Sequence, residues 1–331
     1  WHVKEYLNEK KLIKDKHVER VVFNEITKKA VIRGIENPRQ IEPLLVDAYM
    51  ARRALDYLVG FNISPILWTK LPGSKSAGRV QSVALKLITE REHEIELFNP
   101  KEFWTLSVKF NNKDKKQILA SISLLNDSKI EKFSFKNKED IDKAKQDIKS
   151  KKFQINDISS KIINRNPSGP FTTSTLQQVA SGKLGFGASR TMQIAQKLYQ
   201  GIEIEGETIG LITYMRTDGT NLSSDAIVTF RSYIKTEFGN EYLPETALNY
   251  AGKKAKNAQE AHEAIRPTDI MRSPDKLKKY LSTDQLKLYD LIWSRALSSQ
   301  MESAKFDRNT ITITSEDKGT ICKASGSVIK F

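Results

Sequence analysis

Apolar residues recur at helical spacing in several stretches of the chain. Leu44, Ala48, Ala51 and Leu55 lie four, three and four residues apart, which predicts a helix over 44–59 that Gly60 ends. Similar spacing predicts six further helices, at 79–98, 139–149 and 284–302, from Thr173 or Ser174, from Ser189 to Gly201, and from Ser223 or Ser224 to Gly239.

Other stretches alternate apolar and polar residues, which is typical of half-buried antiparallel strands. This pattern predicts strands at 104–110, 118–124, 153–163, 309–314 and 320–331, and a short one at 20–23. The apolar, β-branched run at 208–214 predicts a buried strand. The main strand groups flank a long helical stretch, and sheet edges need partners. We therefore expect a multidomain α+β protein, in which a helical domain is inserted into a discontinuous β-rich domain.

Composition adds a first indication of function. The 331 residues allow two or three domains, and the formal net charge is +14 (54 Lys+Arg against 40 Asp+Glu). Such a charge favours a nucleic-acid partner, although a soluble basic surface has the same sum. No apolar run is long enough for a membrane helix, so we expect no membrane contact. The single cysteine, Cys322, excludes a disulfide framework and a cysteine-based zinc site, which suits the cytoplasm.

The stretch 73–79 (GSKSAGR) has the glycine spacing of a phosphate loop. Arg79 and Val80 stand where that motif needs Lys and Ser or Thr, so a nucleoside-triphosphate site is rejected. Small residues and two cations at the start of a helix can still contact a nucleic-acid backbone through Lys75 and Arg79, with Gln81 as a neutral donor. The alternative is a capped helix with a solvated basic turn.

Residues 262–266 (HEAIR) begin like the zinc-protease motif. Arg266 replaces the second histidine that the motif requires, so a zinc site of that kind is excluded. The alternative to a role in a site is that His262 is an ordinary surface or core histidine.

Residues 213–218 (TYMRTD) place a tyrosine at the end of the predicted buried strand. A tyrosine hydroxyl, with a pKa of about 10, becomes a nucleophile only where cations stabilise the phenolate. Tyr214 could attack a phosphodiester while Arg216 balances the transition-state charge and Asp218 orients either side chain. The alternative is a packed tyrosine beside an Arg–Asp ion pair. The helices around 183–189 also suggest a helix-turn-helix, which would bind DNA without chemistry.

Four segments, in order, resemble motifs of the type IA DNA topoisomerases. They are 76–84 (SAGRVQSVA), 170–178 (PFTTSTLQQ) followed by 184–186 (LGF), 210–218 (GLITYMRTD) and 261–268 (AHEAIRPT). Met215, where the topoisomerase III branch tends to have proline, favours the bacterial topoisomerase I branch. Gly219 departs from the family, which usually has serine there.

The resemblance implies that Tyr214 cleaves one DNA strand and becomes linked to its 5′-phosphate. It implies that Arg216 and His262 lie near the scissile phosphate and that Asp218 supports them. Resealing would relax negative supercoils without ATP. DNA contacts, on a single-stranded segment, are expected for Arg79, Gln81, Lys75, Ser76, Thr172, Arg190 and Arg266.

The resemblance also implies an architecture, toroidal in the full-length protein. We expect the tail of a Toprim domain at 1–42, part of a helical single-strand-groove domain at 43–100, and a β-rich arch at 101–168 and 273–331. The inserted helical domain, at 169–272, would carry Tyr214.

The same resemblance leaves several elements outside this sequence. Mg²⁺ would be bound by Toprim carboxylates outside it, and this chain would supply no metal ligand. We therefore expect an inactive core fragment of a monomeric cytoplasmic enzyme, lacking most of the Toprim domain and the C-terminal region.

Two rival functions remain. One is a non-catalytic module that binds single-stranded DNA, and an acidic cluster upstream of Trp1 would argue against it. The other is a metal-dependent phosphodiesterase, for which clustered Asp and His ligands are missing from the sequence.

Overall fold

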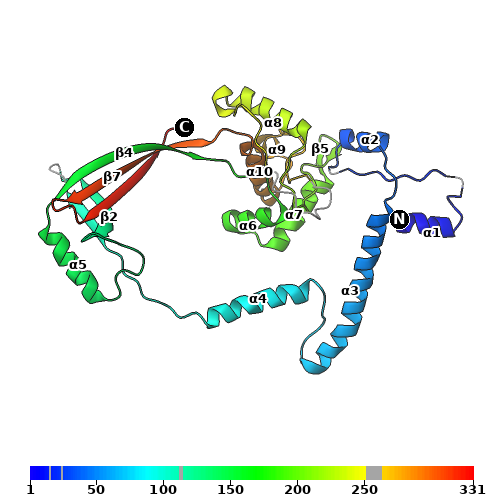
Figure 1. The fold of residues 1–331 in the computed structure, drawn as a ribbon. Helices are drawn as coiled ribbons and strands as arrows, with labels where there is room; N and C mark the ends of the chain where they lie inside the picture. Colours follow the sequence, from blue (N-terminus) through cyan, green and yellow to red (C-terminus); the bar gives the residue numbers. More distant parts are fainter. Residues whose placement is uncertain (15, 24, 112–114, 251–262) are drawn as a thin grey trace. The chain divides into compact units, whose positions relative to one another are not determined.

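The computed structural model describes residues 1–331 except 15, 24, 112–114 and 251–262 (Figure 1). The chain divides into two compact units. The first comprises Trp1–Val22 and Asn37–Glu102, and the second comprises Phe23–Glu36 and Phe103–Phe331. Residues 23–36 thus belong with the second unit. The resemblance instead grouped all of residues 1–42 as one Toprim tail. The domain limits expected from the resemblance stay predictions.

The first unit is built from helices. α3 (Pro43–Lys70) and α4 (Gln81–Glu96) are long, whereas α1 (His2–Glu9) is short. α3 continues past Gly60, so the prediction that Gly60 ends it was wrong. Gly60 lacks the positive φ of a helix-ending glycine, and a single interior glycine costs only about 1 kcal/mol. The strand expected at 20–23 is reduced to one bridge between Arg20 and Arg39.

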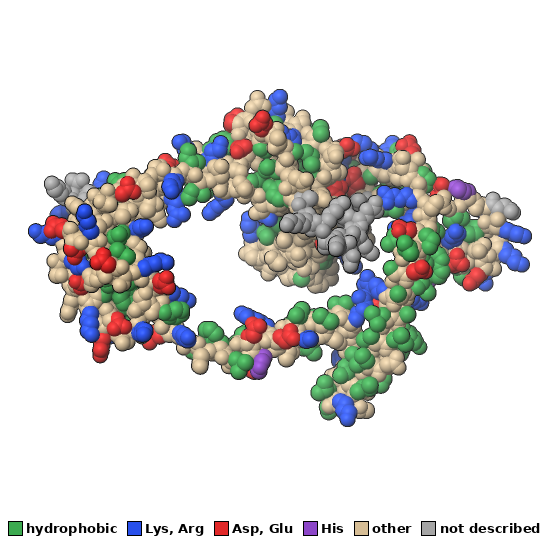
Figure 2. Space-filling model, viewed as in Figure 1, with side chains coloured by type: hydrophobic (Ala, Val, Ile, Leu, Met, Phe, Trp, Pro, Cys, Tyr) green, Lys and Arg blue, Asp and Glu red, His purple; other side chains and the backbone are tan. Residues whose placement is uncertain are grey.

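Large apolar side chains on α3 and α4 are exposed. Phe61 is 69% exposed, Trp68 58% and Leu87 62%. Figure 2 shows hydrophobic side chains along much of the exposed surface of α3. The apolar residues whose spacing predicted these two helices are therefore exposed, and no other described residue buries them.

The sheet of the second unit joins both groups of predicted strands. Its order is β1-β2-β8-β7-β4, with β3 beside β2, and every pairing is antiparallel. The prediction that the distant strand groups share one sheet is confirmed. The strands are β1 (Ser107–Asn111), β2 (Gln117–Leu125), β3 (Ser128–Lys129), β4 (Phe153–Arg165), β7 (Ala304–Ser315) and β8 (Ile321–Ile329).

The sheet has a small core of its own. Ala120, Ile313 and Cys322 are buried there, and Ile148 of α5 (Lys138–Ser150) packs onto them. Burial raises the pKa of the Cys322 thiol to about 11. The thiol is therefore a packed apolar group, as a buried cysteine usually is.

Between β4 and β7 the chain forms the helical insertion. Leu176, Leu198, Leu288 and Ile292 are fully buried in its core. Its elements are α6 (Thr173–Leu184), α7 (Ala188–Gln200), the hairpin β5 (Ile202–Ile204) and β6 (Glu207–Ile209), α8 (Ser224–Glu237), the 3₁₀ turn η1 (Asn240–Tyr242), α9 (Pro274–Leu277) and α10 (Thr283–Ser298). α2 (Lys28–Glu36) belongs to the same unit.

The buried strand predicted at 208–214 is only partly present. β6 ends at Ile209, and beyond it Ile212 makes a single bridge to Pro267. Leu211, Ile212 and Thr213 are nevertheless at most 1% exposed. The apolar run thus predicted burial correctly, but the segment is extended chain between helices rather than a strand within a sheet.

Candidate active site around Tyr214

Tyr214 follows the buried residues of this segment and turns outward. It is 37% exposed. Its ring meets that of Tyr199, near the end of α7, edge-on, with centroids 5.3 Å apart. Burial raises the pKa of Tyr199, and the neighbouring Tyr214 raises it further. Tyr214 is therefore the accessible member of a pair of tyrosines.

Thr213 fixes the backbone immediately before Tyr214. Its amide donates to the Arg266 carbonyl at 2.9 Å, and its hydroxyl donates to the Ala264 carbonyl at 2.7 Å. The amide of Arg266 donates back to the same hydroxyl at 3.0 Å. The segment 264–266 in turn bonds to Phe171, whose carbonyl accepts from the Ile265 amide at 2.9 Å. Three of the four sequence motifs thus meet at this point.

The loop after Tyr214 is held by Thr173 at the start of α6. The Thr173 amide donates to the Thr217 carbonyl, and the Thr217 amide donates to the Thr173 hydroxyl, both at 2.8 Å. The Thr173 hydroxyl lies 2.8 Å from the Met215 carbonyl, which can accept its proton. The residues on both sides of Tyr214 are therefore fixed to the body of the insertion.

This loop and the start of α6 line an open pocket of about 520 Å³, formed by Thr172, Thr173, Ser174, Arg216, Thr217 and Asp218. Thr172, not Thr173 or Ser174 as expected, caps α6, and Thr175 completes a capping box. A helix N-terminus and an arginine both favour an anion. The pocket brings Arg216, Asp218 and Thr172 together, and the roles expected of these residues stay predictions.

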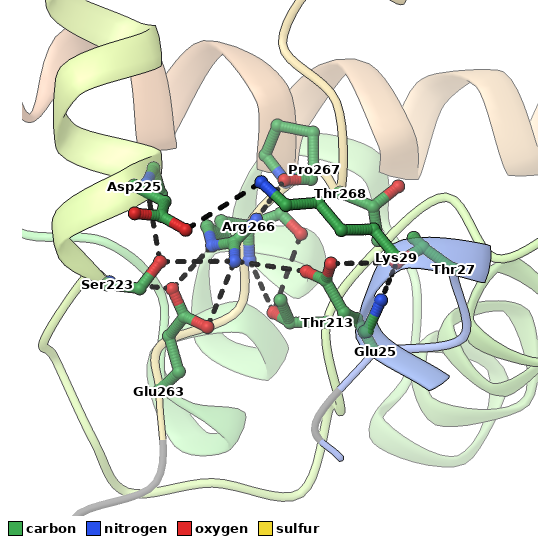
Figure 3. Close-up of polar contacts among 12 residues, drawn as sticks. Glu25, Thr27, Lys29, Thr213, Ser223, Asp225, Glu263, Arg266, Pro267 and Thr268 are labelled. Atoms are coloured by element: carbon green, nitrogen blue, oxygen red, sulfur yellow. Dashed lines mark hydrogen bonds and ion pairs between the residues drawn. The ribbon is translucent and has the colours of Figure 1, made fainter. Parts of the chain in front are cut away.

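Arg266 has a different place from the one expected. Its side chain is only 8% exposed (Figure 3). The guanidinium donates to both carboxylate oxygens of Glu263, at 2.6 and 3.0 Å, and to Glu25 at 3.0 Å. The DNA contact expected of Arg266 is therefore replaced by a buried structural role.

Arg190 remains at the surface but is paired. Its guanidinium donates to Asp284, at the start of α10, and lies 4.6 Å from the ring of Phe186. More than half of the Arg190 side chain is exposed. A phosphate contact at Arg190 would therefore compete with Asp284, and the DNA contact expected of Arg190 stays a prediction.

In the first unit, the loop before α4 is tied to α3. The Ala77 amide donates to the buried Ser64 hydroxyl at 3.0 Å, and the Trp68 indole donates to the Lys75 carbonyl at 2.7 Å. Ser76 accepts two bonds from the side-chain amide of Gln81, which is folded back onto the loop.

Arg79, beside this loop, pairs with both oxygens of Asp56 of α3. That hydrogen bond lowers the pKa of Asp56 and raises that of Arg79. The Asp56 carboxylate therefore offsets part of the charge that the sequence offered to DNA.

His262 lies outside the described residues. Within the described ranges, no three His, Cys, Asp or Glu residues gather where they could hold a metal ion. The resemblance places the Mg²⁺ ligands outside this chain, and that expectation stays a prediction. Among the helices that the structure describes, none is long and apolar enough to cross a membrane.

Sequence reasoning missed Thr213, Thr173 and Glu25. Thr213 had a usable signal, because a hydroxyl inside an otherwise apolar buried run must find a partner. Thr173 was considered only as a helix cap. Glu25 had no signal, because its partner Arg266 is 241 residues away along the chain.

Comparisons with known proteins agree with these motifs. A family model described as DNA topoisomerase matches residues 40–331. DNA topoisomerase 1 of Rickettsia felis is 53% identical over the whole chain, and that of Zymomonas mobilis is 48% identical. The solved full-length topoisomerase I of Thermotoga maritima is 35% identical and superposes with a TM-score of 0.80 over 99% of the chain.

The relatives are longer than this chain. It spans 43% of the Rickettsia felis protein, 26% of the Zymomonas mobilis protein and 51% of the Thermotoga maritima chain. The mixture of helices with an antiparallel sheet is the α+β fold expected of the family core. On the family match, the identities and the fold together, the chain belongs to the bacterial type IA DNA topoisomerases.

Proposed function

We propose that this chain carries the nucleophile of a type IA topoisomerase, which cleaves and reseals one DNA strand through Tyr214. One observation carries the proposal. Tyr214 is exposed, yet the residues on both sides of it are held by the buried Thr213 and the partly buried Thr173, next to a pocket lined by Arg216 and Asp218. A nucleophile needs access and a fixed position together.

In the proposed reaction the Tyr214 hydroxyl oxygen attacks the phosphorus of a DNA phosphodiester. The O–P bond to tyrosine forms as the hydroxyl gives up its proton, the bond to the 3′-oxygen breaks, and the departing 3′-oxygen takes up a proton, so the step is balanced. Arg216 would stabilise the added negative charge on the phosphate, with the amides at the start of α6 as further donors. Attack by the 3′-hydroxyl on the phosphotyrosine reverses these steps, so no ATP is needed.

The substrate we propose is a single-stranded segment of negatively supercoiled DNA. The net charge of +14 favours a polyanion, and Lys75 and Arg79 lie in the loop just before α4. The DNA roles of Ser76 and Gln81 belong to the same proposal. We place the reaction in a monomer in the bacterial cytoplasm, with Mg²⁺ held by residues outside this chain.

The test uses a full-length protein containing this sequence, a single-stranded oligonucleotide labelled at its 3′ end, which stays with the phosphotyrosine after cleavage, and denaturing gels. Tyr214→Phe should abolish the covalent protein–DNA adduct, because only the attacking oxygen is removed. Tyr199→Phe is the matched control, since it removes the hydroxyl of the neighbouring ring and should leave the adduct.

Two results would count against the function. An adduct that survives Tyr214→Phe would show that another group attacks the phosphate. Binding of the oligonucleotide without an adduct in the unmodified protein would favour the non-catalytic DNA-binding module. Whether the protein is an enzyme or a DNA-binding module, its affinity for the oligonucleotide should fall steeply with salt concentration, because phosphate contacts release counterions.

A further inference from the structure

The buried charge cluster around Arg266 is not needed for any step of the proposed chemistry. Arg266 faces two carboxylates, Glu263 and Glu25, and also donates to the Pro267 carbonyl at 2.9 Å. Glu263 also accepts a bond from the Ser223 amide, at the start of α8. A buried arginine with this many partners is held in one orientation, because each donor has its own acceptor.

The same residue controls the backbone next to the nucleophile. While its side chain points toward Glu25, the backbone of Arg266 exchanges hydrogen bonds with Thr213 (Figure 3). Thr213 directly precedes Tyr214. The position of the guanidinium can therefore affect Tyr214 through Thr213, which bonds to the Arg266 backbone once through its amide and once through its hydroxyl.

The segment that supplies Glu25 touches the tyrosine segment a second time. The Gly210 amide donates to the Ile26 carbonyl at 3.3 Å. A Cβ on Gly210 would lie 3.0 Å from that carbonyl oxygen, so the two backbones are in close contact. Glu25 also accepts from the Thr27 hydroxyl at 3.0 Å, which orients its carboxylate just before α2.

We propose that Glu25 and Arg266 are positioning residues for Tyr214, so that residues 25–26 form part of the active-site scaffold. The inference rests on the proposed function. It assigns to a segment far from the catalytic motif the task of fixing the nucleophile's backbone. Neither side chain touches DNA in this account.

The test compares Glu25→Gln and Arg266→Lys in the full-length enzyme. Gln keeps the shape of Glu25 but loses the charge, and Lys keeps the charge of Arg266 but cannot reach three acceptors in one plane. Lys29→Gln is the matched control. Lys29 lies in the same segment, is 85% exposed, and reaches Asp225 of α8 only at 3.9 Å.

Two constants are measured for each variant. One is the rate of adduct formation at saturating oligonucleotide, and the other is the affinity of the same variant for the oligonucleotide in a Tyr214→Phe background. We expect adduct formation to slow by about ten- to a hundredfold for Glu25→Gln and Arg266→Lys, since a misplacement of about 1 Å can cost a hundredfold. Affinity should change less than about twofold, and Lys29→Gln should match the unmodified enzyme.

The outcomes are separable. Equal losses of affinity and adduct rate would show that the cluster only stabilises the fold, and would overturn the inference. A loss of adduct rate in Lys29→Gln as large as in Glu25→Gln would overturn it in the same way. Unchanged adduct formation in both variants would also overturn it. Should Arg266→Lys fail to fold, Glu25→Gln decides alone. If the unmodified enzyme forms no adduct through Tyr214, the proposed function fails first, which the Tyr214→Phe experiment shows independently.

Discussion

Replacing Gly210 by alanine tests the packing behind the nucleophile. The new Cβ would lie 2.7 Å from the Tyr199 carbonyl oxygen, closer than Cβ atoms essentially ever approach, and 3.0 Å from that of Ile26, which is also a tight contact. Both neighbours are backbone atoms, so neither can rotate away. Such overpacking typically costs about 1–3 kcal/mol. The bond from the Gly210 amide to Ile26 would also be strained.

For a domain of about 150–250 residues, each 1 kcal/mol lowers Tm by about 2–4 °C. We therefore expect Gly210→Ala to lower the Tm of the helical insertion by about 2–12 °C in a thermal scan followed by circular dichroism. Gly182→Ala is the control, because nothing lies within 4 Å of its Cβ and alanine favours the helix α6. A Gly210→Ala protein that melts with the unmodified protein would refute the close contact.

Three further outcomes are expected. The Cys322 thiol should resist iodoacetamide at pH 8 until urea unfolds the sheet. Because burial raises the pKa of this thiol, its contribution to the free energy of unfolding is complete below about pH 9, the ordinary pKa of a thiol. That contribution is lost as pH rises toward about 11, and urea titrations at several pH values can measure the loss. Thr213→Val should destabilise the insertion by about 1–3 kcal/mol in urea, because two buried groups lose their partner, whereas Thr229→Val removes only an exposed bond and should cost far less. Asp56→Asn should raise the affinity for single-stranded DNA at low salt by releasing Arg79, and an unchanged affinity would argue against a DNA contact there.

Local sequence patterns were sufficient for most elements of the fold. The sheet, the inserted helices and the cap of α8 at Ser223 follow from periodicity and capping residues. Periodicity failed at Gly60, because a glycine ends a helix only where the chain turns into positive φ. It also failed at residues 211–213, because burial by helices and burial within a sheet give the same apolar run.

The candidate site was predictable where its residues are neighbours in the sequence. Arg216 and Asp218 share a pocket because one short loop carries both. Arg266 was misjudged because its charge suggested a phosphate, whereas its partners come from a distant segment and from its own turn. A single sequence contains no local signal for such a pairing, since only tertiary packing brings Glu25 to it.

The register of β4 and β7 has a consequence for the order of folding. Arg165 pairs with Ala304, so the chain enters the helical insertion from β4 and returns to β7 at the same paired position of the sheet. Pairing these strands before the insertion has folded would require closing a long flexible loop, whose entropic cost grows with its length. Once the insertion is folded, its two ends already lie side by side and the strands can pair from that position outward. Pulsed hydrogen exchange during refolding should therefore protect amides of α6 and α10 before those of β4.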